Sequence, residues 1–168
     1  HYFDELSDKE LKVLIPGVGY GHEAEYLIAS GFRNVHVLDI VESPLLDLQK
    51  RVKSPFLHIH REDFFQHENQ YDLIIEQTFF CALHPSERER FVQKTYDLLK
   101  MRGKMAGLLW NVEMNTDRPP FGGSVEEYIR LFQHDFNIEV MEQANHSVLP
   151  RKGREVFFVI KKADHLKK

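Results

Sequence analysis

The sequence predicts one doubly wound α/β domain with a mostly parallel sheet, and two patterns support this fold class. Short apolar runs typical of buried strands alternate five times with segments of helical spacing, and two further strand-like runs follow. A glycine-rich turn joins the first apolar run to the first helical segment, as happens where a parallel strand passes into a helix beneath a ligand. The 168 residues contain no internal repeat and no linker long enough to divide them, so we expect a single domain over residues 1–168.

The first strand is expected at about residues 11–15 and the first helix at about residues 22–29. Between them, Gly17, Gly19 and Gly21 occupy alternate positions. Glycine is needed in such a turn because the backbone adopts angles that a Cβ would penalise, and because a ligand must approach the main chain closely. We therefore take these glycines as candidate cofactor-binding residues. A tight turn without a ligand is the alternative.

The second strand, at about residues 34–39, ends in a carboxylate, Asp39, at the usual distance after a nucleotide-binding glycine loop. An acid at this place commonly accepts hydrogen bonds from both hydroxyls of an adenosine ribose. Ser43 and Pro44 then supply a capping residue and a proline at the first helical position, which opens a second helix. The third strand is expected at about residues 56–60.

The fourth strand, at residues 71–76, is the clearest buried strand of the chain. Ser86 and Glu89 form the pattern of a capping box for the next helix, and Gly103 is expected to end that helix. Ser124 is the expected cap of a further helix. The remaining elements are a helix at 86–100, a strand at 104–110, a helix at 125–132, and a closing hairpin of strands at 136–143 and 155–161.

The glycine spacing indicates the kind of ligand. Gly-x-Gly-x-Gly is followed by His22, so the third glycine of the dinucleotide pattern is absent. Glu23 lies in the first helical turn, where a carboxylate favours the helix dipole but would repel a pyrophosphate. A nucleoside with an ammonium group and no phosphates fits better, and S-adenosylmethionine is such a ligand. A nicotinamide oxidoreductase is the alternative enzyme class, which both features disfavour.

Ligands of doubly wound sheets lie beyond the carboxyl ends of the strands, where this chain carries several polar residues. After the third strand, Asp63 is placed to accept a hydrogen bond from an adenine amino group, with Phe64 as an apolar face or backbone donor. A solvated acid beside a core aromatic is the alternative. After the fourth strand come Glu76, Gln77 and Thr78. Polar groups buried there must find partners, so they either bond neighbouring turns or face the methyl donor and its substrate.

Composition limits the classes of function. The formal net charge is −4 and basic residues are scattered, so no electrostatic surface for nucleic acid is predicted. No apolar run approaches the ~20 residues of a membrane span, and no membrane association is expected. The single cysteine, Cys81, excludes an intramolecular disulfide and a multi-cysteine zinc site, and it indicates a cytoplasmic setting. The ten histidines are dispersed along the chain, and we expect no metal site from them.

Four stretches of the chain together resemble the thiopurine S-methyltransferase family, and its plant halide/thiol methyltransferase branch in particular. They are residues 15–21, 76–85, 119–124 and 150–155. The similarity extends over about residues 12–161, and the combination is far more specific than a glycine loop alone. It implies a single S-adenosylmethionine-dependent methyltransferase domain with a Rossmann-like sheet of seven strands, the last of them antiparallel.

The resemblance also implies roles for residues around the cofactor, whose product is S-adenosylhomocysteine. The glycines would hold the methionine end, Asp39 the ribose, and Asp63 with Phe64 the adenine. The three polar residues after the fourth strand would lie near the transferred methyl group. The full set of cofactor-binding candidates is Gly17, Gly19, Gly21, Asp39, Ile40, Asp63, Phe64, Glu76, Gln77 and Thr78.

For the methyl acceptor, the resemblance points to basic residues. Arg88 matches an arginine near the acceptor pocket of the thiopurine enzymes, while Arg151 and Arg154 match a second basic position at the rim. His84 is a candidate proton acceptor. The catalytic candidates are therefore Arg88, Arg154 and His84, although the arginines are equally consistent with surface ion pairs and the His-Pro pair with a turn.

The expected reaction is in-line methyl transfer to a small soft nucleophile: a thiol, bisulfide, a halide or a thiopurine sulfur. The alternatives are an oxygen or nitrogen acceptor on another small molecule, and a non-catalytic scaffold that binds S-adenosylmethionine. The oligomeric state is open, with a monomer favoured. Family members carry an N-terminal segment that folds over the cofactor, and because this chain begins shortly before the first strand we expect that lid to be lacking.

Overall fold

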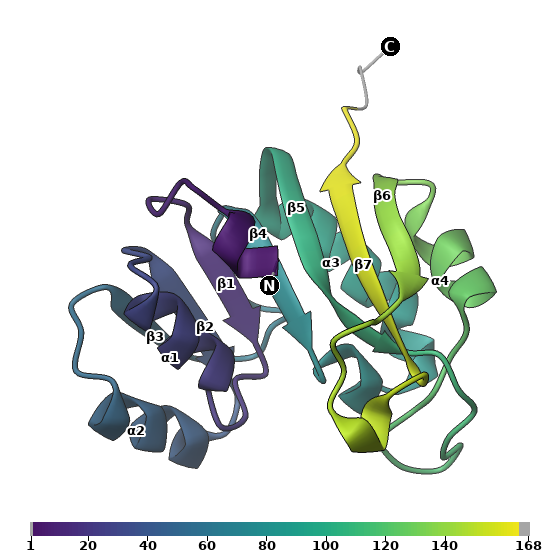
Figure 1. Cartoon of the computed structure of the whole chain (residues 1–168), viewed down its shortest axis with the longest axis horizontal. Helices are drawn as coiled ribbons and strands as arrows, with labels where there is room; N and C mark the ends of the chain where they lie inside the picture. Colours follow the sequence, from purple (N-terminus) through teal and green to yellow (C-terminus); the bar gives the residue numbers. More distant parts are fainter. Residues whose placement is uncertain (1, 165–168) are drawn as a thin grey trace.

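A seven-stranded sheet forms the centre of the computed structural model, which describes residues 2–164 (Figure 1). The strands lie in the order β3-β2-β1-β4-β5-β7-β6. The chain starts at β1 in the middle of the sheet, moves outwards to β3 and crosses back to β4, so the order reverses between β1 and β4. The strands are β1 Val13–Pro16, β2 Val35–Asp39, β3 Leu57–Arg61, β4 Tyr71–Gln77, β5 Leu99–Trp110, β6 Phe136–Gln143 and β7 Glu155–Lys162.

Among the strands of the described residues, β7 runs antiparallel to both strands beside it. The pairs from β3 to β5 are all parallel, whereas β7 is antiparallel to both β5 and β6. The prediction of a mostly parallel, seven-stranded sheet with an antiparallel last strand is therefore confirmed. The closing hairpin is also present, with β7 between β5 and β6. Burial explains this order, since β7 is buried over most of its length while β6 exposes several residues and forms the edge.

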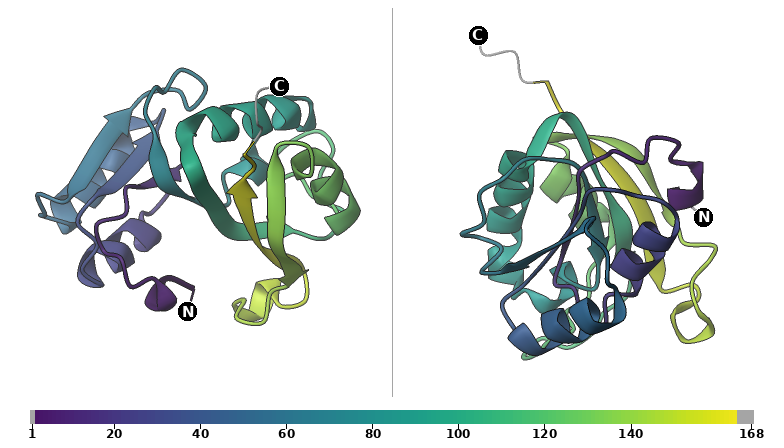
Figure 2. Two further views of the ribbon diagram at one scale, coloured as in Figure 1. Left: turned by 90° about the horizontal axis from the view of Figure 1, so that it is seen from above. Right: turned by 90° about the vertical axis from the view of Figure 1, so that its left-hand side faces the viewer.

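Helices cover both faces of the sheet, and Figure 2 shows the three layers edge-on. Side chains of β4 alternate between the layers, with Ile74 in the apolar cluster beneath α3 and α4, and Leu73 and Ile75 in the cluster beneath α1 and α2. No helix within residues 2–164 is long and apolar enough to cross a bilayer. The helices are α1 His22–Ala29, α2 Glu42–Arg51, α3 Arg88–Leu98 and α4 Val125–Phe132.

Two predicted helix starts have different outcomes. Ser124 caps α4 as expected, because its Oγ accepts from the N–H of Glu127 at 3.3 Å. The start predicted for α2 is wrong: the helix begins at Glu42 without a side-chain cap, so Ser43 and Pro44 lie inside its first turn. The proline is tolerated there because the first N–H groups of a helix have no intrahelical partner.

The capping box predicted from Ser86 and Glu89 is also wrong. Ser86 lies in a short 3-10 turn, Pro85–Glu87, and its Oγ bonds Nδ1 of His84 at 2.8 Å. The first turn of α3 therefore starts after this 3-10 turn and has no side-chain cap. The hydroxyl takes the nearer imidazole as its partner instead of a helical N–H.

The end predicted for α3 is wrong as well, because β5 begins at Leu99 directly after the helix. Gly103 lies inside this strand and does not terminate the helix. Around it the pairing with β4 shifts register, and Arg102 has a φ of 63°. Such a bulge absorbs extra residues, so the chain passes from helix to strand without a separate loop.

Candidate active site

The glycine loop leaves its central residue open. Gly17, Gly19 and Gly21 have φ angles of 64°, 52° and 74°, which residues with a Cβ rarely adopt. A Cβ at Gly17 would lie 2.4 Å from Cδ2 of Phe79, and one at Gly21 would lie 2.7 Å from Cδ1 of Leu48. At Gly19 no atom lies within 4 Å of that position. Packing requires the outer two glycines, whereas the central one leaves main chain that a ligand can approach.

Asp39 lies beside this loop because β1 and β2 are parallel neighbours. The N–H of Gly17 donates to the carbonyl of Leu38 at 2.8 Å, which fixes the glycine turn next to the end of β2. Oδ1 of Asp39 accepts from the N–H of Val41 at 2.9 Å. Ile40, between them, is 70% exposed. A carboxylate and an exposed apolar side chain thus sit together at the carboxyl end of β2.

The two residues predicted for the adenine take different positions. Asp63 is exposed, and its Oδ1 accepts from the N–H of Phe65 at 2.9 Å. Phe64 is buried, and its ring packs against Phe79 and Phe91 with centroid distances of 5.1 and 5.4 Å. The ring of Phe64 therefore belongs to the core, and only its main chain is left for a ligand.

Glu76 is buried at the end of β4 with one carboxyl oxygen satisfied. Oε1 accepts from the N–H groups of Phe79 and Phe80 at 3.0 and 2.8 Å, whereas Oε2 has no partner. Burial raises the pKa of Glu76 to about 8, partly offset by these two N–H donors. Thr78, in the same turn, has a φ of 63°. The side chain thus bonds the neighbouring turn, one of the two alternatives, and its second oxygen remains for a ligand.

Arg88 lies beneath the loop of residues 119–124 and is only 4% exposed. It pairs with Glu127 of α4, and its Nη2 donates to the carbonyl of Gly122 at 2.7 Å. The guanidinium also lies over the ring of Phe80, 4.9 Å from its centroid. Arg88 therefore ties α3 to α4 and to the loop before it. The structure does not place it in an open pocket.

Two later arginines flank the ring of Trp110. The guanidinium carbons of Arg151 and Arg154 lie 5.2 and 5.4 Å from its centroid. Arg151 also pairs with the buried Glu155 at 3.2 Å. The predicted basic rim thus adjoins, through Trp110, a small cleft at the end of β4. The lining of that cleft includes Glu76, Thr78, Cys81, Trp110 and Glu155.

His84 is exposed and stabilises a turn. Its Nδ1 accepts from the N–H of Ser86 at 3.2 Å, and its ring packs edge-on against Phe121 at 5.5 Å. A turn of this kind was the alternative interpretation of the His-Pro pair. Of the three catalytic candidates, Arg154 lies by the cleft, whereas Arg88 and His84 contact the loop of residues 119–124.

A cavity of about 400 Å³ beside the end of β4 was not expected from the sequence. Ala106 and Gly107, small residues within β5, line it. Four glutamates also line it: Glu5, Glu23, Glu76 and Glu142. Other lining residues are Tyr2, Phe3, Gln77, Leu108 and Phe157.

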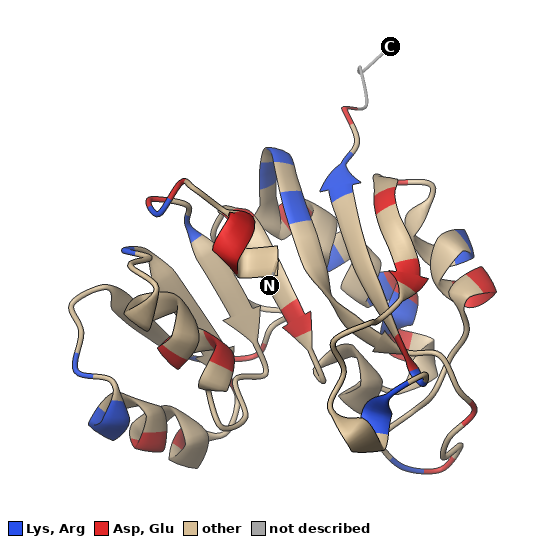
Figure 3. Cartoon of the chain, viewed as in Figure 1, with Lys and Arg blue, Asp and Glu red and all other residues tan. Residues whose placement is uncertain are grey.

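Three of these carboxyl groups, those of Glu5, Glu23 and Glu142, suit a cationic ligand, whereas burial keeps Glu76 largely neutral near pH 7. In the view of Figure 3, acidic segments occur at the N-terminal turn, at the start of α1 and at the end of β4, while basic residues are dispersed over the other elements. The ammonium and sulfonium groups of S-adenosylmethionine carry the charge that such a cavity favours. The open main chain at the central glycine and the partnerless oxygen of Glu76 are two further features that fit this cofactor.

The fold and this site define an S-adenosylmethionine-dependent methyltransferase, and solved structures share the fold. The Burkholderia thailandensis 1,6-didemethyltoxoflavin-N1-methyltransferase, with 1,6-didemethyltoxoflavin and S-adenosylhomocysteine bound, has a TM-score of 0.77 at 17% identity, covering 92% of this chain and 72% of that one. The N-methyltransferase NodS of Bradyrhizobium japonicum WM9, in complex with S-adenosylhomocysteine, has a TM-score of 0.76 at 14% identity, covering 92% and 80%.

The chain belongs to the thiopurine S-methyltransferase family. It matches the family model described as Thiopurine S-methyltransferase (TPMT) over residues 1–167. It is 30% identical over 162 residues to thiocyanate methyltransferase 1 of Arabidopsis thaliana, covering 92% of this chain and 71% of that protein. It is 32% identical over 151 residues to the probable thiol methyltransferase 2 of the same plant, covering 86% of this chain and 66% of that protein. The resemblance to the halide/thiol branch is thereby confirmed.

Proposed function

We propose that this protein methylates a small, soft, anionic nucleophile, with a thiolate or bisulfide favoured over a halide or a thiopurine sulfur. The single observation that carries the proposal is the open main chain of Gly19 beside Asp39, which together make a cradle for a nucleoside. Glu23, in the first turn of α1, disfavours a pyrophosphate at this place. The relatives named for thiocyanate and thiol methylation support a sulfur acceptor.

The positions of the residues support the following cofactor-binding roles. The glycine loop holds the methionine end, and Asp39 with the exposed Ile40 holds the ribose side. Asp63 and the main chain of Phe64 hold the adenine. Glu5, Glu23 and Glu142, which line the cavity, attract the ammonium group.

S-adenosylmethionine, when bound, supplies the sulfonium methyl group that the acceptor attacks in line. A thiolate already carries its lone pair, so the chain needs no strong general base and works by alignment and by excluding water. The raised pKa of Glu76 keeps its carboxyl group largely neutral near pH 7, so an anion approaching the cleft meets little repulsion there. Arg154, with Arg151, attracts and orients the anion at the rim formed by Trp110.

Arg88 and His84 act indirectly in this mechanism, through a loop. Both contact the loop of residues 119–124, which we place over the acceptor. They hold that loop in position and do not themselves touch the nucleophile.

The test begins with calorimetric titration of the protein with S-adenosylhomocysteine, for which we expect binding at one site. Methyl transfer from labelled S-adenosylmethionine is then followed with bisulfide, small thiols, iodide and a thiopurine, against a phenol and an amine as controls. Transfer to sulfur at a rate well above the controls supports the proposal. Transfer only to oxygen or nitrogen overturns the acceptor class, binding without any transfer indicates a scaffold, and absence of binding overturns the cofactor assignment.

A further inference from the structure

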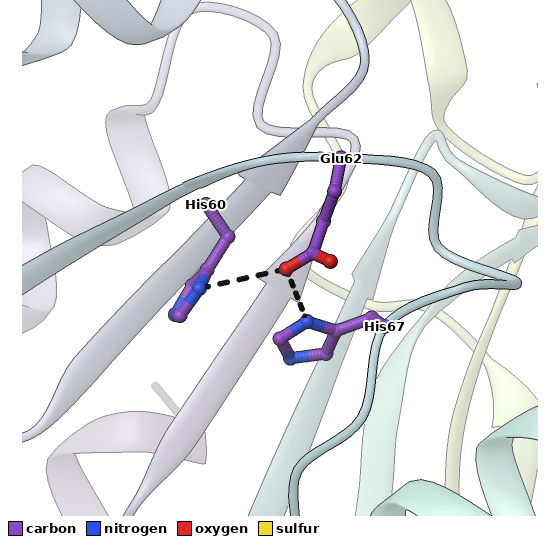
Figure 4. Close-up of side chains that lie close together, drawn as sticks. All are labelled: His60, Glu62 and His67. Atoms are coloured by element: carbon purple, nitrogen blue, oxygen red, sulfur yellow. Dashed lines mark hydrogen bonds and ion pairs between the residues drawn. The ribbon is translucent and has the colours of Figure 1, made fainter.

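Three side chains from one eight-residue stretch come together where β3 passes into β4. They are His60 of β3, Glu62 just after that strand, and His67, which is 2% exposed. Figure 4 shows the carboxyl group of Glu62 pointing between the two imidazole rings. Oε1 of Glu62 lies 3.7 Å from Nδ1 of His60 and 2.7 Å from Nδ1 of His67, and one ligand atom from each residue lies within 4.8 Å of the others.

A chain of hydrogen bonds fixes which nitrogen of His60 carries a hydrogen. Oδ1 of Asn34 only accepts, so Nε2 of His36, at 2.8 Å, must donate to it. Nδ1 of His36 then has a lone pair and accepts from Nε2 of His60 at 2.8 Å. The remaining nitrogen of neutral His60, Nδ1, consequently carries a lone pair and faces the carboxylate of Glu62. Nδ1 of His60 and Oε1 of Glu62 are thus two acceptors that face each other with no hydrogen between them. A cation placed between them would be bound by both lone pairs.

We propose that His60, Glu62 and His67 bind one divalent transition-metal ion of the class that favours imidazole and carboxylate ligands, with Zn²⁺ as the ion to test. Ligand atoms in a tetrahedral zinc site lie about 3.3 Å apart, given metal–ligand distances of about 2.0–2.2 Å. The two measured separations, 3.7 and 2.7 Å, lie on either side of that value. The two histidine nitrogens lie within 4.8 Å of each other, so the imidazole rings must turn toward a common ion, and the partial exposure of His60 and Glu62 leaves a further position for water.

The hydrogen-bond partners of the two histidine ligands, His36 and Tyr71, fit this proposal. Metal-binding histidines donate their other N–H to a fixed acceptor, and His60 already does so to His36. In the metal-free protein Nδ1–H of His67 donates to Glu62, and Nε2 lies 2.6 Å from the hydroxyl of Tyr71. Ion binding moves the hydrogen of His67 from Nδ1 to Nε2, which then donates to that hydroxyl. Both forms of the ring are neutral, so this exchange leaves the proton count unchanged.

The ion would stabilise the connection that carries Asp63. The N–H of Glu62 donates to the carbonyl of Asp39 at 3.2 Å, and Asp63 is the next residue in the chain. No crossover helix joins β3 to β4, since residues 62–70 contain no helix or strand. A metal ion would supply the rigidity that a crossover helix provides in other doubly wound sheets.

The test is calorimetric titration of chelator-treated protein with ZnCl₂, without cofactor, so that its outcome is independent of the methyltransferase proposal. We expect one ion per chain, an increase in Tm with zinc, and at least a tenfold weaker affinity in Glu62→Gln and in His60→Asn. His58→Asn is the matched control, because His58 is exposed and stacks on His36 without belonging to the ligand set. Circular dichroism checks that every variant folds.

Cobalt substitution adds a readout of geometry. Co²⁺ bound by these ligands should give the intense visible absorption of a tetrahedral site, and Glu62→Gln should weaken it. The proposal is overturned if wild-type protein binds no stoichiometric zinc, in which case the cluster is a hydrogen-bond network only. It is equally overturned if both ligand variants keep wild-type affinity, or if His58→Asn loses as much affinity as they do.

Discussion

Gly17 packs directly against the side chain of Phe79, because a Cβ at position 17 would lie 2.4 Å from Cδ2 of Phe79. No residue larger than glycine fits at this position. This contact joins the end of β1 to the turn after β4, the two strands between which the sheet order reverses. The N–H of Phe79 donates to Glu76, and its ring packs on Phe64. One packing contact thus sets the glycine loop, which we assign to the cofactor, against the turn that holds Glu76.

Gly19→Ala should weaken S-adenosylhomocysteine binding at least tenfold, because the added methyl group enters the space that we assign to the ligand. Gly31→Ala is the matched control, since Gly31 also has a positive φ and open space around its Cβ position. Both substitutions should lower the free energy of unfolding by about 1–2 kcal/mol through backbone strain. Calorimetric titration and urea unfolding separate the two effects, and equal affinity in both variants would contradict the cradle.

Asp39→Ala should reduce S-adenosylhomocysteine affinity by at least about 100-fold, because hydrogen bonds to a charged group contribute about 1.5–3 kcal/mol each and the ribose offers two. Asp47→Ala, on the exposed surface of α2, should leave affinity unchanged. Titration calorimetry measures both. If Asp39→Ala binds as tightly as wild type, Asp39 does not hold the ribose.

Glu76 should make the protein less stable as the pH rises. Its folded-state pKa of about 8 lies above the ordinary value of 4.5, so between these values the native state binds more protons than the unfolded state. The free energy of unfolding then falls with rising pH by up to about 1.4 kcal/mol per unit. Urea unfolding at pH 5, 6.5 and 8 should show this slope in wild type and in the exposed-site control Glu89→Gln, and a smaller slope in Glu76→Gln. Equal slopes in all three proteins would refute the assignment.

Arg88→Ala should lower the free energy of unfolding by about 2–3 kcal/mol, because it leaves Glu127 and the carbonyl of Gly122 without their buried partner. Arg90→Ala removes an exposed arginine from the same helix, which pairs with Glu87 and lies over the ring of Phe65, and should cost about 1 kcal/mol or less. Chemical denaturation gives both values. A variant at position 88 that keeps wild-type stability but loses acceptor affinity would instead place Arg88 in the acceptor pocket.

Arg154→Ala should raise KM for an anionic acceptor about 3-fold with little change in kcat, since an exposed charge contributes about 0.2–1 kcal/mol. The effect should shrink at high ionic strength because salt screens the attraction. Arg33→Ala, an exposed arginine near the start of β2, is the control. Steady-state kinetics at two salt concentrations test this, and an unchanged KM would remove Arg154 from the site.

Several features of the fold were predictable because they depend on residues that are close together in the sequence. Alternation of apolar runs and helical segments gave the strands and helices in their correct order, and the glycine spacing gave the loop between β1 and α1. The cap of α4 by Ser124 also followed from local sequence. The caps expected from Ser43 and Ser86 were wrong, because each hydroxyl pattern is compatible with more than one local turn.

The positions of the side chains in the site depend on residues that are far apart in the sequence. Sequence placed Arg88 near an acceptor, but its guanidinium pairs with Glu127, which lies 39 positions later in the chain. The cavity beside Gln77 likewise depends on small residues of β5 and on the N-terminal turn meeting across the sheet.

The sequence by itself determined the class of fold and the glycine loop with Asp39 at the neighbouring strand end, because periodicity and backbone constraints act over a few residues. It also indicated the family, through four stretches that resemble that family and not through periodicity. Only the structure showed that the side chains of His60, Glu62 and His67, which are near neighbours in the sequence, turn toward one another. The tertiary structure alone decided that Phe64 is core, that Arg88 is buried, and that β7 lies between β5 and β6. These features depend on which distant segments pack together. Burial and long-range pairing set that choice, and neither is encoded in the spacing of adjacent residues.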